Sequence, residues 1–79
     1  MPTILLINGL RFFFYSNEGN EPMHIHVTKA EANGKIWMEP GIEIAYLHGF
    51  SKSEEREILH IVSINYKLIK TKWNEYFSK

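Results

Sequence analysis

Residues 3–15 read Thr-Ile-Leu-Leu-Ile-Asn-Gly-Leu-Arg-Phe-Phe-Phe-Tyr, two apolar runs separated by Asn8-Gly9. Asn-Gly between such runs is the strongest short signal for a two-residue hairpin, because both positions accept a positive φ. The runs, 3–7 and 10–15, are rich in β-branched and aromatic residues, which favour a pleated sheet. The stretch therefore predicts an antiparallel β-hairpin.

Three more strands are expected after this hairpin. Residues 16–22 are turn formers and charged residues and predict a loop, followed by an alternating strand over 23–29. Asn33-Gly34 predicts another tight turn before a short strand over 35–38, and Glu39-Pro40-Gly41 predicts a turn before a strand over 42–47. The pattern predicts an antiparallel β-meander of about five strands.

The period of the apolar residues changes after residue 50. Ser51 and Glu54 have the spacing of a capping box, which marks the start of a helix. Apolar residues then recur at helical spacing, which predicts one long amphipathic C-terminal helix over 51–78, packed on the sheet. The expected buried stripe consists of Ile58, Val62, Ile69, Trp73 and Tyr76, flanked by Ile61, Tyr66 and Leu68.

Two residues of this helix do not fit a single buried stripe. Asn65 falls within the stripe among apolar neighbours, and Ile64 falls outside it. One hypothesis is that the helix contacts a partner as well as its own sheet. That partner would be a cognate small protein or a second copy of the chain, which would make a homo-oligomer through the C-terminal helix.

Length and composition limit the class of protein. Seventy-nine residues are enough for one core, so we expect a single domain over 1–79, with the sheet in 1–48 and the helix in 51–78. The absence of cysteine excludes disulfides, thiolate nucleophiles and zinc-thiolate sites. Nine basic and nine acidic residues argue against long-range attraction to nucleic acid or an anionic membrane. No apolar run approaches the roughly 18 residues of a spanning helix, so we expect a cytoplasmic protein without a membrane partner.

The main chemical feature is the pair His24 and His26. In an alternating strand, Met23, Ile25 and Val27 share one face, so both histidines share the other and point away from the core. Two imidazoles at this spacing suit acid and base catalysis near neutral pH, or shared metal ligation. A structural role, with both rings hydrogen-bonded to neighbouring carbonyls, is the alternative.

The preceding strand supplies the other candidate site residues. If Phe13 lies opposite His26 and Tyr15 opposite His24, then Arg11 joins them on one surface. Such a surface suits phosphodiester chemistry, in which arginine holds the phosphoryl charge, the imidazoles transfer protons and the aromatic rings stack a base. For Arg11 a surface strand cation, and for the phenylalanines simple core packing, are the alternatives.

Four segments together give the chain a specific resemblance. They are Gly9 to Gly19 with Arg-Phe-Phe-Phe-Tyr-Ser, Glu-Pro-Met-His-Ile-His-Val over 21–27, Lys-Ile-Trp-Met-Glu-Pro over 35–40, and Trp-Asn-Glu-Tyr-Phe over 73–77. The combination resembles the bacterial domain of unknown function 4160 family, over essentially the whole chain. Matching positions are Arg11, Tyr15, Pro22, His24, His26 and Trp37.

The resemblance implies a partner and brings no established mechanism. Members of that family tend to be encoded beside a second small protein, in pairs that look like toxin–antitoxin modules, which suggests a cognate antitoxin-like partner and RNA as a target. The family often has proline at the position of Met23 and valine at the position of Ile25. Neither difference affects the histidines.

Three functional hypotheses follow. The first is a toxin-like protein that cleaves RNA without metal or cofactor, with His24 and His26 as acid and base, Arg11 holding phosphate and Tyr15 positioning the substrate. The second is a non-enzymatic interaction module that binds a cognate protein. The third makes His24 and His26 metal ligands, completed from among Glu18, Glu21, Glu39 and His48.

Overall fold

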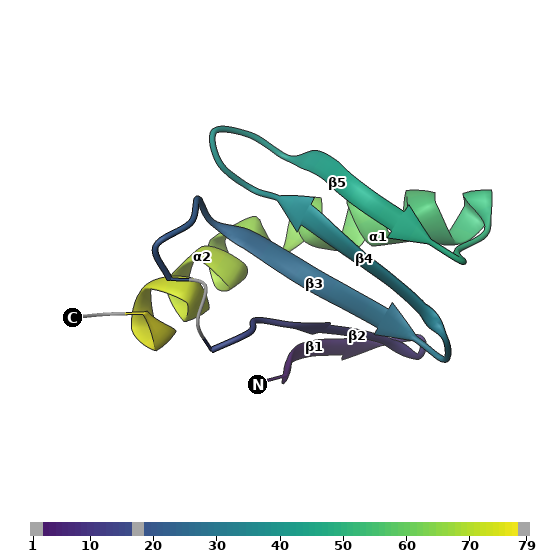
Figure 1. Ribbon diagram of the computed structural model, residues 1–79, viewed down its shortest axis with the longest axis horizontal. Coiled ribbons are helices and arrows are strands. Elements are labelled where there is room, and N and C mark those ends of the chain that lie inside the picture. Colours follow the sequence, from purple (N-terminus) through teal and green to yellow (C-terminus); the bar gives the residue numbers. More distant parts are fainter. Residues whose placement is uncertain (1–2, 17–18, 78–79) are drawn as a thin grey trace.

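The computed structural model describes residues 3–16 and 19–77 and shows an α+β protein (Figure 1). Its strands pair antiparallel in the order β1-β2-β3-β4-β5, which confirms the predicted meander. The strands are β1 Thr3–Ile7, β2 Leu10–Phe13, β3 His24–Lys29, β4 Ala32–Trp37 and β5 Glu43–His48, and the helices are α1 Lys52–Ile64 and α2 Tyr66–Tyr76.

The turn between β1 and β2 is the predicted Asn-Gly hairpin. Asn8 has φ 54° and Gly9 has φ 81°, and Ile7 pairs with Leu10 directly across the turn. Two consecutive positive φ values give the turn a twist that matches the twist of the flanking strands. The local sequence is therefore sufficient to place this hairpin.

The second predicted Asn-Gly turn is wrong. The chain turns at Ala30, which has φ 53°, while Asn33 and Gly34 lie within β4 and pair with Thr28 and Val27. A Cβ at Gly34 would lie 2.9 Å from the backbone oxygen of Tyr46 and only 2.4 Å from Leu47 Cδ2. Glycine is needed at this position because the backbone of β5 approaches too closely for a side chain.

The single long C-terminal helix is also a wrong prediction, because Asn65 divides it into α1 and α2. The backbone N–H of Asn65 and its side-chain Nδ2 both donate to the carbonyl oxygen of Ile61, at 3.1 and 2.9 Å. An asparagine side chain that competes in this way for a backbone carbonyl favours a helix end over a helix interior. No helix in the described part of the chain has the length and apolar character needed to cross a membrane.

The start of α1 follows the prediction. The Ser51 hydroxyl accepts from the Glu54 backbone N–H at 3.1 Å, and the Glu54 carboxylate accepts from the Ser51 N–H at 2.9 Å. Lys29 of β3 also lies 3.1 Å from the Glu54 carboxylate, so the first turn of the helix is tied to the sheet. Backbone and lysine together hold the pKa of Glu54 below its ordinary value of 4.5.

The core lies between the two helices and one face of the sheet. In Figure 1 α1 crosses behind the strands, and α2 lies beyond the end at which β3 begins. We call the strand surface that carries Ile25 and Val27 the covered face and the opposite surface the open face. The core cluster contains Leu10, Phe12, Phe14, Met23, Ile25, Val27, Ile36, Met38, Ile58, Ile61, Val62, Ile69 and Trp73.

Candidate functional site

The pairing of β2 with β3 brings the predicted site residues to the open face. Phe13 pairs with His26 and Arg11 with Thr28, which is the register that the sequence left open as one alternative. Directly opposite residues in an antiparallel pair share a face, so Arg11, Phe13 and His26 lie on the same side of the sheet. β2 ends at Phe13, so the considered pairing of Tyr15 with His24 does not form, but the Tyr15 ring contacts His26.

The contacts within this group are close. The Arg11 guanidinium carbon lies 4.6 Å from the centre of the Phe13 ring, and the Phe13 and His26 rings stack at 5.6 Å. Tyr15 meets His26 edge-on at 4.5 Å and Phe13 at 5.2 Å. Arg11 also donates from Nε to Thr3 Oγ1 at 2.8 Å. The guanidinium is therefore positioned by an aromatic face and a hydroxyl.

His24 occupies the centre of an aromatic cluster. Its ring lies 5.2 Å from His26, 5.3 Å from Trp37 of β4 and 5.1 Å from Trp73 of α2, centre to centre. Its Nδ1 lies 2.9 Å from the carbonyl oxygen of Pro22. Aromatic rings in edge-to-face contact at these separations stabilise one another beyond the area they bury.

The two imidazoles lie side by side, as expected, but they do not face solvent. The exposed fraction is 0% for His24 and 6% for His26, so the two rings lie on the expected face, away from the main core, and are nevertheless buried. Strand alternation placed them on the correct face, but neighbouring strands and Trp73 of α2 supply rings that enclose them. Residues on the open face can therefore be buried, although they lie opposite the main core.

Charged side chains line the edge of the histidine pair. Glu21 Oε1 lies 3.9 Å from His24 Nδ1 and 3.2 Å from Lys35 Nζ. Lys35 pairs with His26 across β3 and β4, and its Nζ lies 4.1 Å from the centre of the Trp37 ring. The lysine is therefore neutralised by a carboxylate and packed on an indole.

The proposed metal ligands are not brought together. Among residues 3–16 and 19–77, no group of three or more His, Cys, Asp or Glu residues could hold a metal ion. The Glu39 carboxylate lies 3.3 Å from the backbone nitrogen of Met23, and His48 stacks on Tyr46 at the far end of β5. Glu18 lies outside the described residues.

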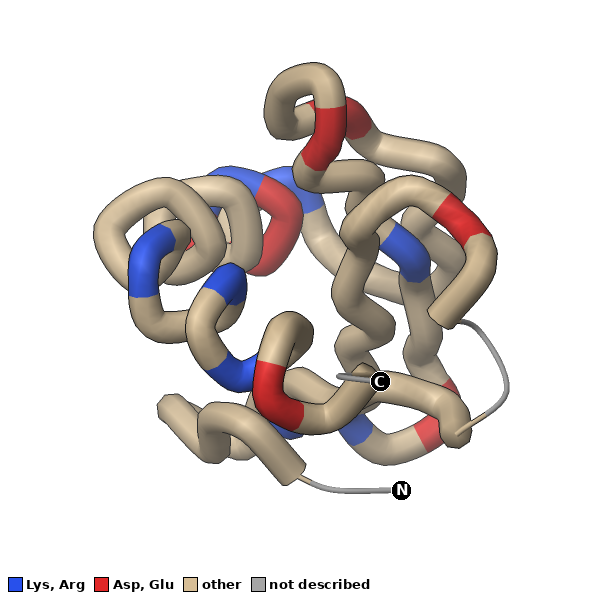
Figure 2. Tube along the Cα trace, turned by 90° about the vertical axis from the view of Figure 1, so that its left-hand side faces the viewer, with Lys and Arg blue, Asp and Glu red and all other residues tan. Residues whose placement is uncertain are grey.

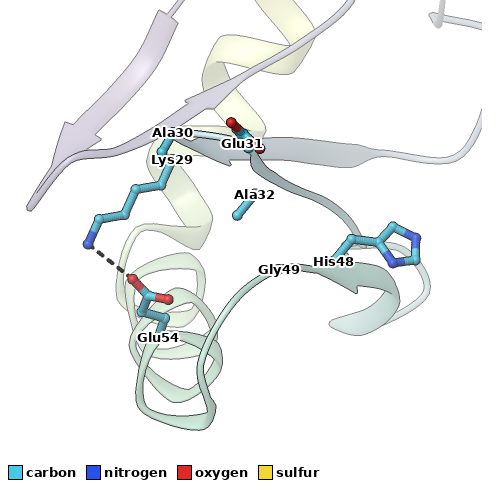
Figure 3. Close-up of a pocket in the computed structure, with 7 residues that line it drawn as sticks. All are labelled: Lys29, Ala30, Glu31, Ala32, His48, Gly49 and Glu54. Atoms are coloured by element: carbon cyan, nitrogen blue, oxygen red, sulfur yellow. Dashed lines mark ion pairs between the residues drawn. The ribbon is translucent and has the colours of Figure 1, made fainter.

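A separate cleft of about 540 Å³ lies at the opposite end of the sheet (Figure 3). The Lys29–Glu54 ion pair forms one wall, and His48 lies on the other side. Its lining consists of Lys29, Ala30, Glu31, Ala32, His48, Gly49 and Glu54. None of the four predicted site residues borders this cleft, so the cleft is distinct from the aromatic cluster.

Three residues without a predicted catalytic role extend the open face. Lys35, Trp37 and Tyr46 continue the rows of Arg11, Tyr15 and the histidines onto β4 and β5, because Trp37 pairs with His24 and Tyr46 with Lys35. The signal for Lys35 and Trp37 was the alternation within 32–37, which was lost because residues 33–34 were interpreted as a turn. Tyr46 lies in the strand that was predicted over 42–47, and no pattern there gave it a role.

The architecture defines a small α+β protein with a histidine–aromatic cluster on the open face of a five-stranded meander. The family model described as "Domain of unknown function (DUF4160)" matches residues 9–74, and the chain belongs to this family. Among curated proteins and among solved structures, none is significantly similar to the chain.

Proposed function

We propose that this protein is a non-enzymatic interaction module that binds a cognate small protein through the open face of its sheet. The observation that carries the proposal is the make-up of that face. Tyr15 and Tyr46 are exposed there, next to the half-buried Arg11, Lys35 and Trp37. Tyrosine, tryptophan and arginine are the residues most enriched at the energetic centres of protein interfaces.

The charges of the open face favour a protein over a nucleic acid. Lys35 is paired with Glu21, and Glu43 lies on the same face opposite Trp37. An RNA-binding surface gains affinity by neutralising several phosphates with unpaired cations. A balanced face instead suits a partner that presents its own aromatic and charged groups.

The burial of His24 supports a structural role for that residue. A general acid or base must come within hydrogen-bond reach of the reacting group, about 3 Å. The His24 ring is enclosed by Trp37, Trp73 and His26. In this proposal the ring fixes the orientation of the surrounding indoles and thereby the shape of the binding face. The resemblance to a family with paired small genes supports a protein partner of antitoxin type.

Co-purification with the product of the adjacent gene tests the proposal. The tagged chain and its Tyr15→Ala and Arg11→Ala variants are each co-expressed with that product. Loss of one interface anchor costs about 1–2 kcal/mol, so each variant is expected to bind roughly tenfold more weakly. Leu68→Ala, a partly exposed residue of α2, is the matched control and should bind as the unmodified chain does. Failure of the unmodified chain to bind would refute the proposal.

A second candidate function is RNA cleavage without metal, favoured by the ring contacts of Phe13, Tyr15 and His26 on one face, with Arg11 over the Phe13 ring. His26 would transfer the proton and Arg11 would hold the phosphate, with Tyr15 positioning the substrate. Inducing the unmodified chain and a His26→Gln variant in cells tests this candidate. Growth arrest and RNA decay with the first protein alone would favour it, and equal growth with both would exclude it.

A further inference from the structure

We propose that the free edge of β5 binds an extended, apolar segment of a partner protein that carries lysine or arginine at its ends. The inference rests on the proposed function, because it names the part of a protein partner that is bound. It also extends the contact surface, because the free border of β5 adjoins the open face at Tyr46. We call residues 42–48 the β5 edge.

The first step is that the β5 edge is an unpaired strand. In the described part of the chain, β5 hydrogen-bonds only to β4 and forms one border of the sheet. A border strand presents a row of backbone N–H and C=O groups that can pair with another extended chain. Partner proteins exploit such borders by adding a strand, and main-chain hydrogen bonds then supply much of the affinity.

The second step is that the two border strands of the sheet differ in how many of their side chains pack against the core. β1 packs Ile4, Leu5 and Ile7 against the core, whereas β5 contributes only Leu47. Ile44 is 41% exposed and Tyr46 is 37% exposed, even though both lie within the strand. The β5 edge therefore keeps apolar side chains in solvent that a neighbouring strand would cover.

The third step concerns the direction of those side chains. Ile44 pairs with the core residue Ile36, and Tyr46 pairs with Lys35 on the open face, because an extra residue, Ala45, interrupts the register. The interruption places one large apolar side chain on each side of the sheet, next to the free border. A strand added there meets an apolar neighbour on both of its faces. Such a strand needs a nearly continuous apolar run rather than strict alternation.

The fourth step is charge. Between residues 36 and 51 the chain has Glu39 and Glu43 and no lysine or arginine. In Figure 2 the loop between β4 and β5, at the top of the view, carries red segments and no blue. Proteins commonly protect exposed strand borders with lysine, and this border lacks that protection. Glu43 lies within this border and its carboxylate favours a partner segment with a cationic end, whereas the Glu39 carboxylate accepts from the backbone N–H of Met23.

A peptide titration of the full-length chain tests the inference. The probe is the peptide Lys-Lys-Val-Ile-Tyr-Val-Lys-Lys. Its binding is measured in low salt by the changes in amide chemical shift of the isotope-labelled protein. We expect the largest shifts at residues 42–48 and slower amide exchange there. The matched peptide with glutamate in place of lysine should bind at least about fivefold more weakly, and added salt should reduce that difference. A peptide with proline at alternate central positions should not bind, because it cannot pair along a strand.

Two exposed positions separate the edge from other surfaces. Ile44→Lys places a charge beside the free border and should weaken probe binding at least tenfold. Ile64→Lys is the matched control on α1, where the side chain is 67% exposed, and should leave binding unchanged. Glu43→Lys should remove or reverse the preference for the lysine-flanked peptide.

Several results would overturn the inference. Shifts confined to the helices or to the part of the open face outside residues 42–48, equal binding of the acidic peptide, or self-association of the chain through residues 42–48 would each do so. Binding of a uridine decamer at the same residues would replace the protein segment with RNA. If Ile44→Lys leaves binding of the cognate protein intact while Tyr15→Ala weakens it, the β5 edge is excluded and the proposed function stands.

Discussion

The two faces of the sheet are buried in different ways. On the covered face, aliphatic side chains such as Ile25 and Val27 meet α1 and form an ordinary hydrophobic core. On the open face, His24 and His26 reach comparable burial mainly through rings contributed by neighbouring strands, with Trp73 closing one end. A polar side chain can therefore be buried without a covering layer, provided that its cross-strand neighbours are aromatic.

The comparison can be tested first on Phe12 of β2 and on Tyr15, which lies just beyond the end of that strand. Phe12→Ala on the covered face should lower the free energy of unfolding by about 3–5 kcal/mol, because it removes a fully buried ring and leaves a cavity. Tyr15→Ala, whose ring is partly exposed on the open face, should cost less than about 1.5 kcal/mol. Urea denaturation of both variants measures the difference. Equal losses of unfolding free energy would show that the two faces of the sheet contribute equally to stability.

The histidine cluster offers the next largest effect. His24→Ala should cost about 2–4 kcal/mol, because it removes ring contacts and leaves the Pro22 carbonyl without its 2.9 Å partner. His60→Ala is the matched control, since His60 is exposed on α1 and should change stability by less than about 0.5 kcal/mol. Thermal unfolding at one pH compares them. A negligible effect at His24 would mean that the aromatic cluster does not stabilise the fold.

Two glycine-to-alanine substitutions, at Gly34 and Gly41, test how closely β4 and β5 approach each other. Gly34→Ala should destabilise the protein by about 1–3 kcal/mol, because the new Cβ would collide with the backbone of Tyr46 and with Leu47. Gly41→Ala, with no atom within 4 Å of the new Cβ, should remain within about 0.5 kcal/mol of the unmodified protein. Denaturant midpoints of the two variants decide the question. Similar midpoints would contradict the close approach.

The smallest effect is a pH dependence at the junction of α1 with the sheet. The pKa of Glu54 is lowered in the folded protein, so its charged form is favoured by folding. The resulting stabilisation is present above pH 4.5, the ordinary value, and is lost as the pH falls through the lower folded-state pKa. Glu54→Gln should therefore reduce the loss of stability between pH 5 and the acid limit, measured by urea midpoints across about pH 2–7. An unchanged pH profile would exclude a contribution from this carboxylate.

The sequence predicted those features that depend on neighbouring residues. The Asn8-Gly9 hairpin, the capping box at Ser51 and the shared face of His24 and His26 all follow from local backbone preferences and strand alternation. The opposition of Phe13 and His26 was one possible register, and only the structure selected it, because a slip of one residue would place Arg11 and Tyr15 on the other face. The family resemblance on the same residues is confirmed by the family match.

Only the tertiary structure decided how the second Asn-Gly pair, the helix and the histidines are used. Gly34 lies in a strand because β5 passes too close for a side chain, and Asn65 ends α1 because its side chain competes for the Ile61 carbonyl. His24 is buried because Trp37 and Trp73, distant in sequence, converge on its ring. These outcomes depend on contacts between segments far apart in the chain, and local patterns do not encode the distances at which such segments meet.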